Sequence, residues 1–305
     1  MKPPTFTLAA DLFPEWREDV LSGTPPTFFP VGEGALAQIE IGPGMVTLIG
    51  GPPGVGKTAF VMQLVIDALR LTPTLKALVA NVEMTPKVLL DRQLARLSGV
   101  DLSSIRHRKL KPEHHERIEI GMEALAKLMG QLTFLGMPYS LENVLNSAQV
   151  FDVDLIVLDY LQRFAPPGEH LQKKAAVDAS MEIVRAIADC GRAVIVVAAV
   201  GRQRDEKGRS GYAGLNLASF RESSELEYGA DDAFLLVPTN ADDPAAVTLK
   251  HVKSRHGEPL DIPLRFTGSV QRFDPSGDPV DNEKLAAAVK EVWDQSGETY
   301  EGGEW

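Results

Sequence analysis

The chain has 305 residues, of which 44% are hydrophobic and 24% are charged, and its formal net charge is −11. This composition is that of a globular protein, and no apolar run approaches the roughly 20 residues of a membrane-spanning helix. The acidic charge argues against an exterior covered by nucleic acid, while it leaves room for a local basic binding site.

The N-terminal residues predict one helix and a loop. Apolar residues at helical spacing indicate a helix within residues 6–22, and Pro14 favours a start at its own position because proline is tolerated in the first turn. A Gly/Pro-rich stretch at residues 22–34 follows and is typical of a linker or loop.

From residue 45 onward, strand and helix patterns alternate along the chain. Thr85 and Pro86 are typical of the N-cap and the first position of a helix. The predicted strands are residues 45–50, 76–84, 132–136, 154–160, 193–200, 232–238, 246–254, 259–268 and 269–274. The predicted helices are residues 57–70, 85–100, 114–129, 140–151, 173–189 and 281–295, with an acidic tail at residues 296–305.

These patterns predict the fold class. The strands at 45–50 and 193–200 are unbroken apolar runs, which are typical of parallel strands buried on both faces. Alternating strands and helices favour a parallel sheet that helices cover on both sides. We therefore expect an α/β protein with a mostly parallel sheet flanked by helices. Antiparallel β-hairpins are expected to extend this sheet at the C-terminal side.

Two further signals concern the cellular compartment. The first residues lack an apolar segment followed by a cleavage site, so we expect no signal peptide. The single cysteine, Cys190, excludes an intramolecular disulfide, and we expect its thiol to lie in the core. Both signals favour a cytoplasmic protein without a membrane partner.

A glycine-rich loop is the first motif that carries chemistry. The segment LIGGPPGVGKTAFVMQL at residues 48–64 contains the pattern G-x-x-x-x-G-K-[ST] between a predicted strand and a predicted helix. In such a loop, backbone N–H groups cradle phosphate oxygens, the lysine adds charge at the β- and γ-phosphates, and the hydroxyl binds Mg²⁺. The expected phosphate-binding residues are Gly51, Pro52, Pro53, Gly54, Val55, Gly56, Lys57 and Thr58.

Two carboxylates near predicted strand ends complete the expected nucleotide site. Asp159 can position a metal ion beside Thr58, and Glu83 can accept a proton from an attacking water. The carboxyl ends of parallel strands gather at one edge of a sheet, beside such a loop. Each residue also has a structural reading, Asp159 as a polar residue that ends a strand and Glu83 as an acid at the start of the next helix.

Further segments occur in a characteristic order after this loop. They are NVEM at 81–84, LDYLQ at 158–162, FRESSELEYGADDAFLLV at 220–237 and KHVKSRHGEPLDIPLRFTGSVQRFD at 250–274. With them, residues 30–275 resemble the C-terminal ATPase domain of DnaB-type replicative helicases, which has a RecA-like fold. The resemblance implies ATP and Mg²⁺ as ligands, Glu83 as the catalytic glutamate and Asp159 as the Mg²⁺ carboxylate.

The resemblance also implies an assembly. In this family, a Lys-x-Arg pair such as Lys253 and Arg255 reaches the γ-phosphate bound by a neighbouring subunit, which makes Arg255 an expected arginine finger. The alternative reading is a solvated basic strand end. A finger that acts in trans requires a homo-oligomer, and the family forms rings of six, so we expect a hexameric ring.

The resemblance divides the chain into three parts. Residues 1–29 correspond to an arm whose helix docks on the next subunit, and the alternative is a helix that packs on its own domain. Residues 30–278 correspond to the RecA-like ATPase domain, and residues 279–305 to a C-terminal helix and acidic tail. The family's separate N-terminal domain, which contacts primase, has no counterpart in this sequence, and a loader or other protein partner stays open.

The family's DNA loops map onto residues 202–224. Side chains and backbone N–H groups there contact the single-strand backbone without reading sequence. The alternative is a surface loop without a ligand. The expected DNA-binding residues are Arg202, Arg204, Arg209, Arg221, Glu222 and Ser224.

Two departures from the family pattern bear on function. Ala198 and Ala199 stand where the family has a Ser-Gln pair that senses the γ-phosphate, and neither side chain can hydrogen-bond. Ser224 replaces a glycine. We therefore expect a Mg²⁺-dependent ATPase that translocates on single-stranded DNA and unwinds duplexes. The alternatives are an ATPase that binds or remodels DNA or a protein without unwinding, and a ring that serves as an assembly scaffold.

Overall fold

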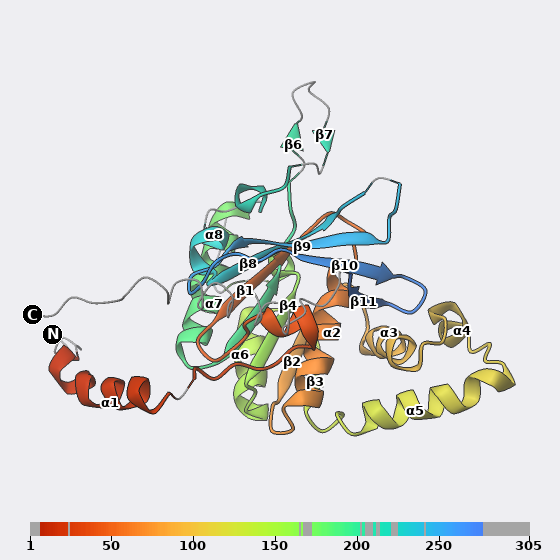
Figure 1. The fold of residues 1–305 in the computed structure, drawn as a ribbon, viewed down its shortest axis with the longest axis horizontal. Coiled ribbons are helices and arrows are strands. Elements are labelled where there is room, and N and C mark those ends of the chain that lie inside the picture. Colours follow the sequence, from red (N-terminus) through yellow and green to blue (C-terminus); the bar gives the residue numbers. More distant parts are fainter. Residues whose placement is uncertain are drawn as a thin grey trace, which may run out of the picture.

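The computed structural model describes residues 7–23, 25–164, 166, 173–201, 203–204, 210–211, 214–220, 225–240 and 242–276. Its centre is a nine-stranded sheet in the order β11-β10-β9-β8-β1-β5-β4-β2-β3 (Figure 1). The strands are β1 Val46–Gly50, β2 Ala77–Asn81, β3 Leu132–Phe134, β4 Leu155–Asp159, β5 Ala193–Val197, β8 Asp232–Pro238, β9 Ala246–Lys253, β10 Ile262–Thr267 and β11 Arg272–Pro275. β6 Gln203–Arg204 and β7 Ser210–Gly211 pair with each other as a separate antiparallel hairpin.

The direction of the strands confirms the predicted fold class. β3, β2, β4, β5, β1 and β8 pair in parallel, whereas β9, β10 and β11 extend the sheet in antiparallel fashion. Every residue of β1, β2, β4 and β5 is buried. Burial on both faces requires apolar side chains at successive positions, which explains why these strands read as unbroken apolar runs.

Helices cover both faces of the sheet. The helices in the described part of the chain are α1 Ala9–Ser22, which lies apart from the sheet, α2 Lys57–Leu71, α3 Pro86–Ser98, α4 Leu102–Arg106, α5 His115–Ala126, α6 Leu141–Phe151, α7 Lys173–Asp189 and α8 Glu225–Gly229. Side chains of α2, α3 and α5 form one core cluster with Ile195 and Val197 of β5. Side chains of α6, α7 and α8 form a second cluster with Val194 and Val196, because successive residues of a strand point to opposite faces.

Two local expectations were wrong, and a third was confirmed. α1 begins at Ala9, so Pro14 lies inside the helix rather than at its start, because the exposed turn before it continues as helix. Thr85 and Pro86 occupy the N-cap and the first position of α3 as predicted, although the Thr85 side chain accepts no capping hydrogen bond. Cys190 is exposed, since it lies in the turn after α7, where its N–H donates to Ala186 O.

Two other parts of the fold bear on the expected domain division. α1 has no buried residues and lies apart from the sheet in Figure 1, while its apolar side chains Leu12, Phe13, Trp16 and Val20 are exposed. The helix and tail expected at residues 281–305 lie outside the described residues. Within the described part of the chain, no helix is long and apolar enough to cross a membrane.

Candidate active site

The glycine-rich loop lies between β1 and α2, as the sequence predicted. Gly51 and Gly56 have φ angles of 151° and 96°, which L-residues with a side chain rarely adopt. A Cβ on Gly51 would lie 2.6 Å from Leu236 O, and one on Gly56 would lie 2.9 Å from Phe273 Cζ. Glycine at both positions therefore lets the loop curl tightly against β8 and β11 before α2 begins at Lys57.

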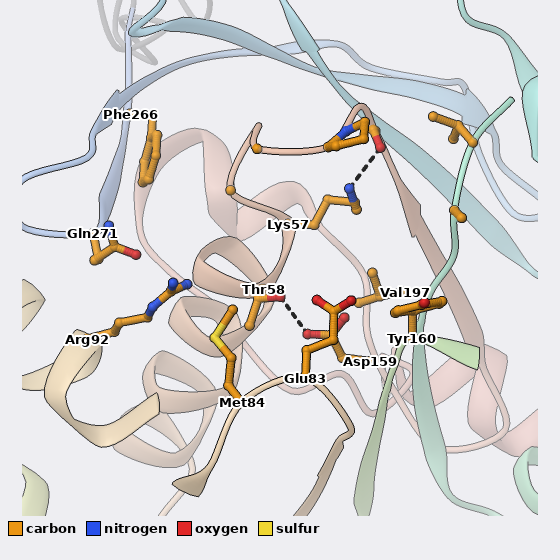
Figure 2. A pocket seen from close by; sticks show the side chains of 16 residues that line it. Lys57, Thr58, Glu83, Met84, Arg92, Asp159, Tyr160, Val197, Phe266 and Gln271 are labelled. Carbon is orange, nitrogen blue, oxygen red and sulfur yellow. Dashed lines mark hydrogen bonds between the residues drawn. The ribbon is translucent and has the colours of Figure 1, made fainter. Parts of the chain in front are cut away.

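A cavity of about 450 Å³ opens in front of this loop (Figure 2). Most of the loop lines it, but Val55 packs into the core instead, and the Pro52 carbonyl contacts Lys57. The cavity brings together the loop, the ends of β2, β4 and β5, the middle of α3 and the β10–β11 hairpin. Its lining residues are Gly51, Pro53, Gly54, Gly56, Lys57, Thr58, Glu83, Met84, Arg92, Asp159, Tyr160, Val197, Ala199, Val200, Phe266 and Gln271.

Lys57 is the cation at the centre of the cavity. Its Nζ donates to Gly51 O at 2.8 Å and to Pro52 O at 2.9 Å, so the ammonium is held against its own loop. Burial lowers the pKa of Lys57, while the carboxylates of Asp159 and Glu83 oppose that shift. A partly buried cation beside backbone N–H groups at the start of a helix is suited to hold an anion.

Asp159 forms the acidic side of the same cavity. Its Oδ2 accepts from the Thr58 hydroxyl at 2.6 Å and from Asn81 Nδ2 at 2.7 Å. Burial raises the pKa of Asp159, the bond from Thr58 opposes that rise, and the charge of Glu83 adds to it. A hydroxyl and a carboxylate at this spacing are hard oxygen donors of the kind Mg²⁺ prefers.

Glu83 lines the cavity as predicted, although it lies beyond the strand that was expected to carry it. β2 ends at Asn81, and the Asn81 side-chain oxygen accepts from Glu83 N at 3.0 Å and from Met84 N at 2.7 Å. Figure 2 shows the carboxylates of Glu83 and Asp159 close together. Asn81 therefore connects the two acidic residues, a role that the sequence pattern did not indicate.

Arg92 is a second cavity residue that sequence reasoning missed. It lies on α3 and points into the cavity in Figure 2, and its buried Nε has no hydrogen-bond partner in the described part of the chain. Burial lowers the pKa of Arg92, and nearby Arg106 adds to this effect. Its position three residues after the buried Leu89 on a helix was the available signal.

The two alanines at the end of β5 lie in different surroundings. Ala199 lines the cavity, and its N–H donates to Gln162 Oε1 at 3.4 Å. Ala198 is fully buried in the core cluster on the other side of the sheet. Only Ala199 therefore presents a methyl group to the cavity, where a longer polar side chain would reach into it.

Lys253 and Arg255 do not line the cavity. Lys253 is the last residue of β9, and its Nζ donates to Glu227 O and Ala230 O at 2.6 Å each. Arg255 lies beyond the strand, and its Nη1 donates to Asp231 Oδ1 at 2.5 Å. Both cations thus contact α8 or the segment that joins it to β8, and Arg255 lies beyond the end of β9.

The register of the sheet places these cations at the opposite edge from the loop. β8 runs parallel to β1, with Thr47 opposite Asp232, and Lys253 pairs with Ala233 near the start of β8. The loop follows Gly50, at the other end of β1. Gly50 is four residues beyond Val46, which is about 13 Å along the strand. One edge of the sheet therefore carries the cavity, and the other carries Lys253 and Arg255.

Of the expected DNA-binding residues, Arg204 lies in the described part of the chain. Arg202, Arg209, Arg221, Glu222 and Ser224 lie outside the described residues. Arg204 is in β6, where its backbone pairs with Ser210 of β7. Figure 1 shows this hairpin projecting away from the sheet.

Comparisons with known proteins agree with this arrangement. Residues 40–275 match the family model of the DnaB-like helicase C-terminal domain. One solved structure, described as an ATPase domain, is 16% identical, with a TM-score of 0.76 over 90% of this chain and 100% of that chain. A DnaB-like replicative helicase, described with its interactions with primase, is 17% identical, with a TM-score of 0.73 over 88% of this chain and 67% of that one. At these identities the two structures show the fold alone.

Proposed function

The chain belongs to the family of DnaB-like helicase C-terminal domains, and on that premise we propose how its residues bind and hydrolyse ATP and how it acts on DNA. The family makes it an ATP hydrolase of the helicase type. In our proposal it assembles into a head-to-tail ring, translocates on single-stranded DNA through the ring and unwinds duplexes.

The cavity edge holds the nucleotide. The backbone N–H groups of the loop and the Lys57 ammonium bind the β- and γ-phosphates, and Thr58 and Asp159 hold Mg²⁺. When bound, Mg²⁺ supplies positive charge that neutralises charge developing on the phosphates. The bond between Thr58 Oγ1 and Asp159 Oδ2 at 2.6 Å supports this assignment, because it brings the two oxygen donors together.

Glu83 acts as the general base. Its carboxylate orients the attacking water and accepts its proton, and the loop that carries it is fixed by two backbone hydrogen bonds to Asn81. Arg92 points into the same cavity with an unpaired buried Nε. It therefore contributes a further positive charge toward the phosphates, which the two carboxylates alone would repel.

The separation of the two edges is the observation that carries the ring proposal. Arg255 is held at the edge opposite to its own cavity, so it cannot complete the site of the chain to which it belongs. A second copy, placed head to tail, brings an Arg255 to that cavity, where it stabilises transition-state charge. Repetition of such a heterologous contact closes a ring, and we take six subunits from the family resemblance.

The N-terminal helix supports the same assembly. α1 exposes Leu12, Phe13 and Trp16 on a helix with no buried residues, and an apolar surface of this kind marks an interaction site. In the ring, we assign α1 to the surface of the neighbouring subunit. The β6–β7 hairpin, with the segments that flank it, is assigned to the single-stranded DNA.

One observation favours a second candidate function. Ala199 presents a methyl group to the cavity, whereas the family has a polar residue there that senses the γ-phosphate. Without that contact, hydrolysis and DNA movement are less tightly coupled. The second candidate is therefore a ring ATPase that binds or remodels DNA or a protein partner without processive unwinding.

Steady-state ATP hydrolysis tests these candidates. It is measured with and without single-stranded DNA at protein concentrations that span assembly, for the unaltered chain, Arg255→Ala and Arg221→Ala. Several-fold stimulation by DNA that both variants lose supports the motor. Hydrolysis that rises with concentration but ignores DNA supports the second candidate, and hydrolysis that ignores both concentration and Arg255→Ala contradicts the ring.

A further inference from the structure

Asp231 is a buried carboxylate that the hydrolysis mechanism does not use. It lies between α8 and β8, with 4% of its side chain exposed. Its Oδ1 accepts from Arg255 Nη1 at 2.5 Å, and its Oδ2 accepts from Arg185 Nη1 at 2.6 Å and from Val46 N at 2.8 Å. A buried charge is tolerated only when it is paired and hydrogen-bonded, and these three donors meet that requirement.

The contact from Asp231 leaves Arg255 fixed but accessible. The Nη2 of Arg255 also donates to Tyr228 O at 3.3 Å, so two nitrogens of a planar guanidinium are held and its plane is set. The Arg255 side chain nevertheless stays 45% exposed. The guanidinium can therefore keep its bond to Asp231 while it presents other N–H groups outward.

Asp231 is itself attached to the rigid core. Val46 is the first residue of β1, and the backbone of Asp231 also donates to Val46 O at 2.8 Å. Arg185 of α7 donates to Asp189 at 2.9 Å as well as to Asp231. The two hydrogen bonds with Val46 thus fix Asp231 on a central strand, and from it the flexible Arg255 side chain gains a defined direction.

We propose that Asp231 is a positioning residue for Arg255, which it holds in the orientation needed to reach the nucleotide of the neighbouring subunit. This inference rests on the proposed role of Arg255 in trans. The carboxylate touches neither nucleotide nor metal. Its loss misdirects the guanidinium, and misplacement of a catalytic group by about 1 Å costs about 100-fold in rate.

The test uses Asp231→Asn, which keeps one oxygen acceptor and the size of the side chain. We expect kcat for ATP hydrolysis to fall about 100-fold while KM for ATP changes less than about twofold, because the loop and Lys57 are untouched. A fall in kcat with unchanged KM agrees with a group that acts only in the transition state. A matching rise in KM, or an unchanged kcat, overturns the proposal.

Mixed rings separate an effect on the neighbour from an effect on the same chain. Lys57→Ala subunits cannot bind phosphate but carry an intact Arg255, so mixing them with Arg255→Ala subunits should restore hydrolysis. If Asp231 acts through Arg255, mixing Lys57→Ala with Asp231→Asn should restore hydrolysis as well. If Asp231 instead supports its own loop through Val46 and β1, that mixture stays inactive and the positioning role is rejected.

Arg185→Gln serves as the matched structural control. It removes the other guanidinium from the same carboxylate but keeps the Asp231–Arg255 bond, so we expect a lower melting temperature and nearly unchanged kcat. An equal loss of kcat in Arg185→Gln would make Asp231 a general support and overturn the proposal. If the Lys57→Ala and Arg255→Ala mixture itself shows no restored hydrolysis, the trans role fails and the inference falls with it.

Discussion

The two edges of the central sheet are built in opposite ways. At the carboxyl edge, Lys57, Asp159 and Glu83 converge on one cavity. At the amino edge, Lys253 and Arg255 are bonded to carbonyl groups and a carboxylate of their own chain, away from that cavity. The first edge holds the groups that line the cavity. The second edge holds two cations in fixed positions, away from that cavity.

This difference indicates which part of the reaction one subunit can carry out alone. The loop, the lysine and the two carboxylates of the cavity all come from one chain, so we expect a single subunit to bind the nucleotide. In our proposal, stabilisation of the transition state depends on Arg255, which the same subunit holds at the opposite edge. Variants at the two edges should therefore separate nucleotide binding from hydrolysis.

The sharpest test of the comparison is Arg255→Ala. Loss of an arginine finger lowers kcat by about 10³- to 10⁵-fold, and ATP binding should persist because the cavity edge is intact. Binding of a fluorescent ATP analogue and steady-state hydrolysis measure the two effects. Arg265→Ala, which removes an exposed cation on β10, is the control, and loss of binding in Arg255→Ala would contradict the division between the edges.

Glu83→Gln should give a smaller loss at the other edge. Removal of a general base lowers the rate by about 10²- to 10⁴-fold, while the neutral amide leaves the phosphate-binding loop in place. ATP should therefore bind and accumulate without turnover in single-turnover measurements. Glu119→Gln, at an exposed position of α5, is the control. Normal turnover in Glu83→Gln would contradict the assignment of Glu83 as the general base.

Deletion of residues 1–25 should weaken assembly and change hydrolysis only through assembly. One buried side chain of leucine or phenylalanine size contributes roughly 1.5–3 kcal/mol, and about 1.4 kcal/mol is a tenfold change. We expect the concentration for assembly, measured by light scattering, to rise about tenfold or more. Trp16→Ala should act in the same direction and Arg17→Ala should not, and an unchanged mass distribution would refute docking of α1.

The smallest effect concerns stability at the cavity edge. Burial raises the pKa of Asp159 in the folded chain, so the folded chain binds this proton more readily than the unfolded chain, whose pKa is about 3.9. Stability is therefore lost as the pH rises through the raised folded-state pKa. Asp159→Asn should lack that loss and melt higher at neutral pH, yet fail to hydrolyse ATP. Melting curves from about pH 4 upward check this, and a lower melting temperature at neutral pH contradicts it.

The sequence indicated the fold and the cavity edge well, because their signals are local. The loop is a contiguous motif, and Glu83 and Asp159 were found from the rule that parallel strand ends meet at one edge. Asn81 and Arg92 were missed because their roles depend on which side chain meets them across the fold. The short helix α4 was missed, since five residues carry no periodic pattern.

Other predictions lay beyond what a local pattern can decide. Cys190 was expected in the core because cysteine is an apolar residue type, yet the turn that ends α7 directs it to solvent. The sequence did not indicate that Lys253 and Arg255 would contact the residues around the end of α8, because that contact joins segments more than 20 residues apart. The DNA-contact assignments stay predictions, as does the division of the chain into arm, ATPase domain and tail.

The exposed thiol has a practical consequence. The chain has a single cysteine, and it lies exposed just before β5, at the amino edge of the sheet. A maleimide dye therefore attaches to one defined point per molecule without any engineered substitution. Dyes brought together by association exchange excitation energy and depolarise their emission, so a recovery of that polarisation on dilution would report dissociation in real time, with the unaltered sequence as the specimen.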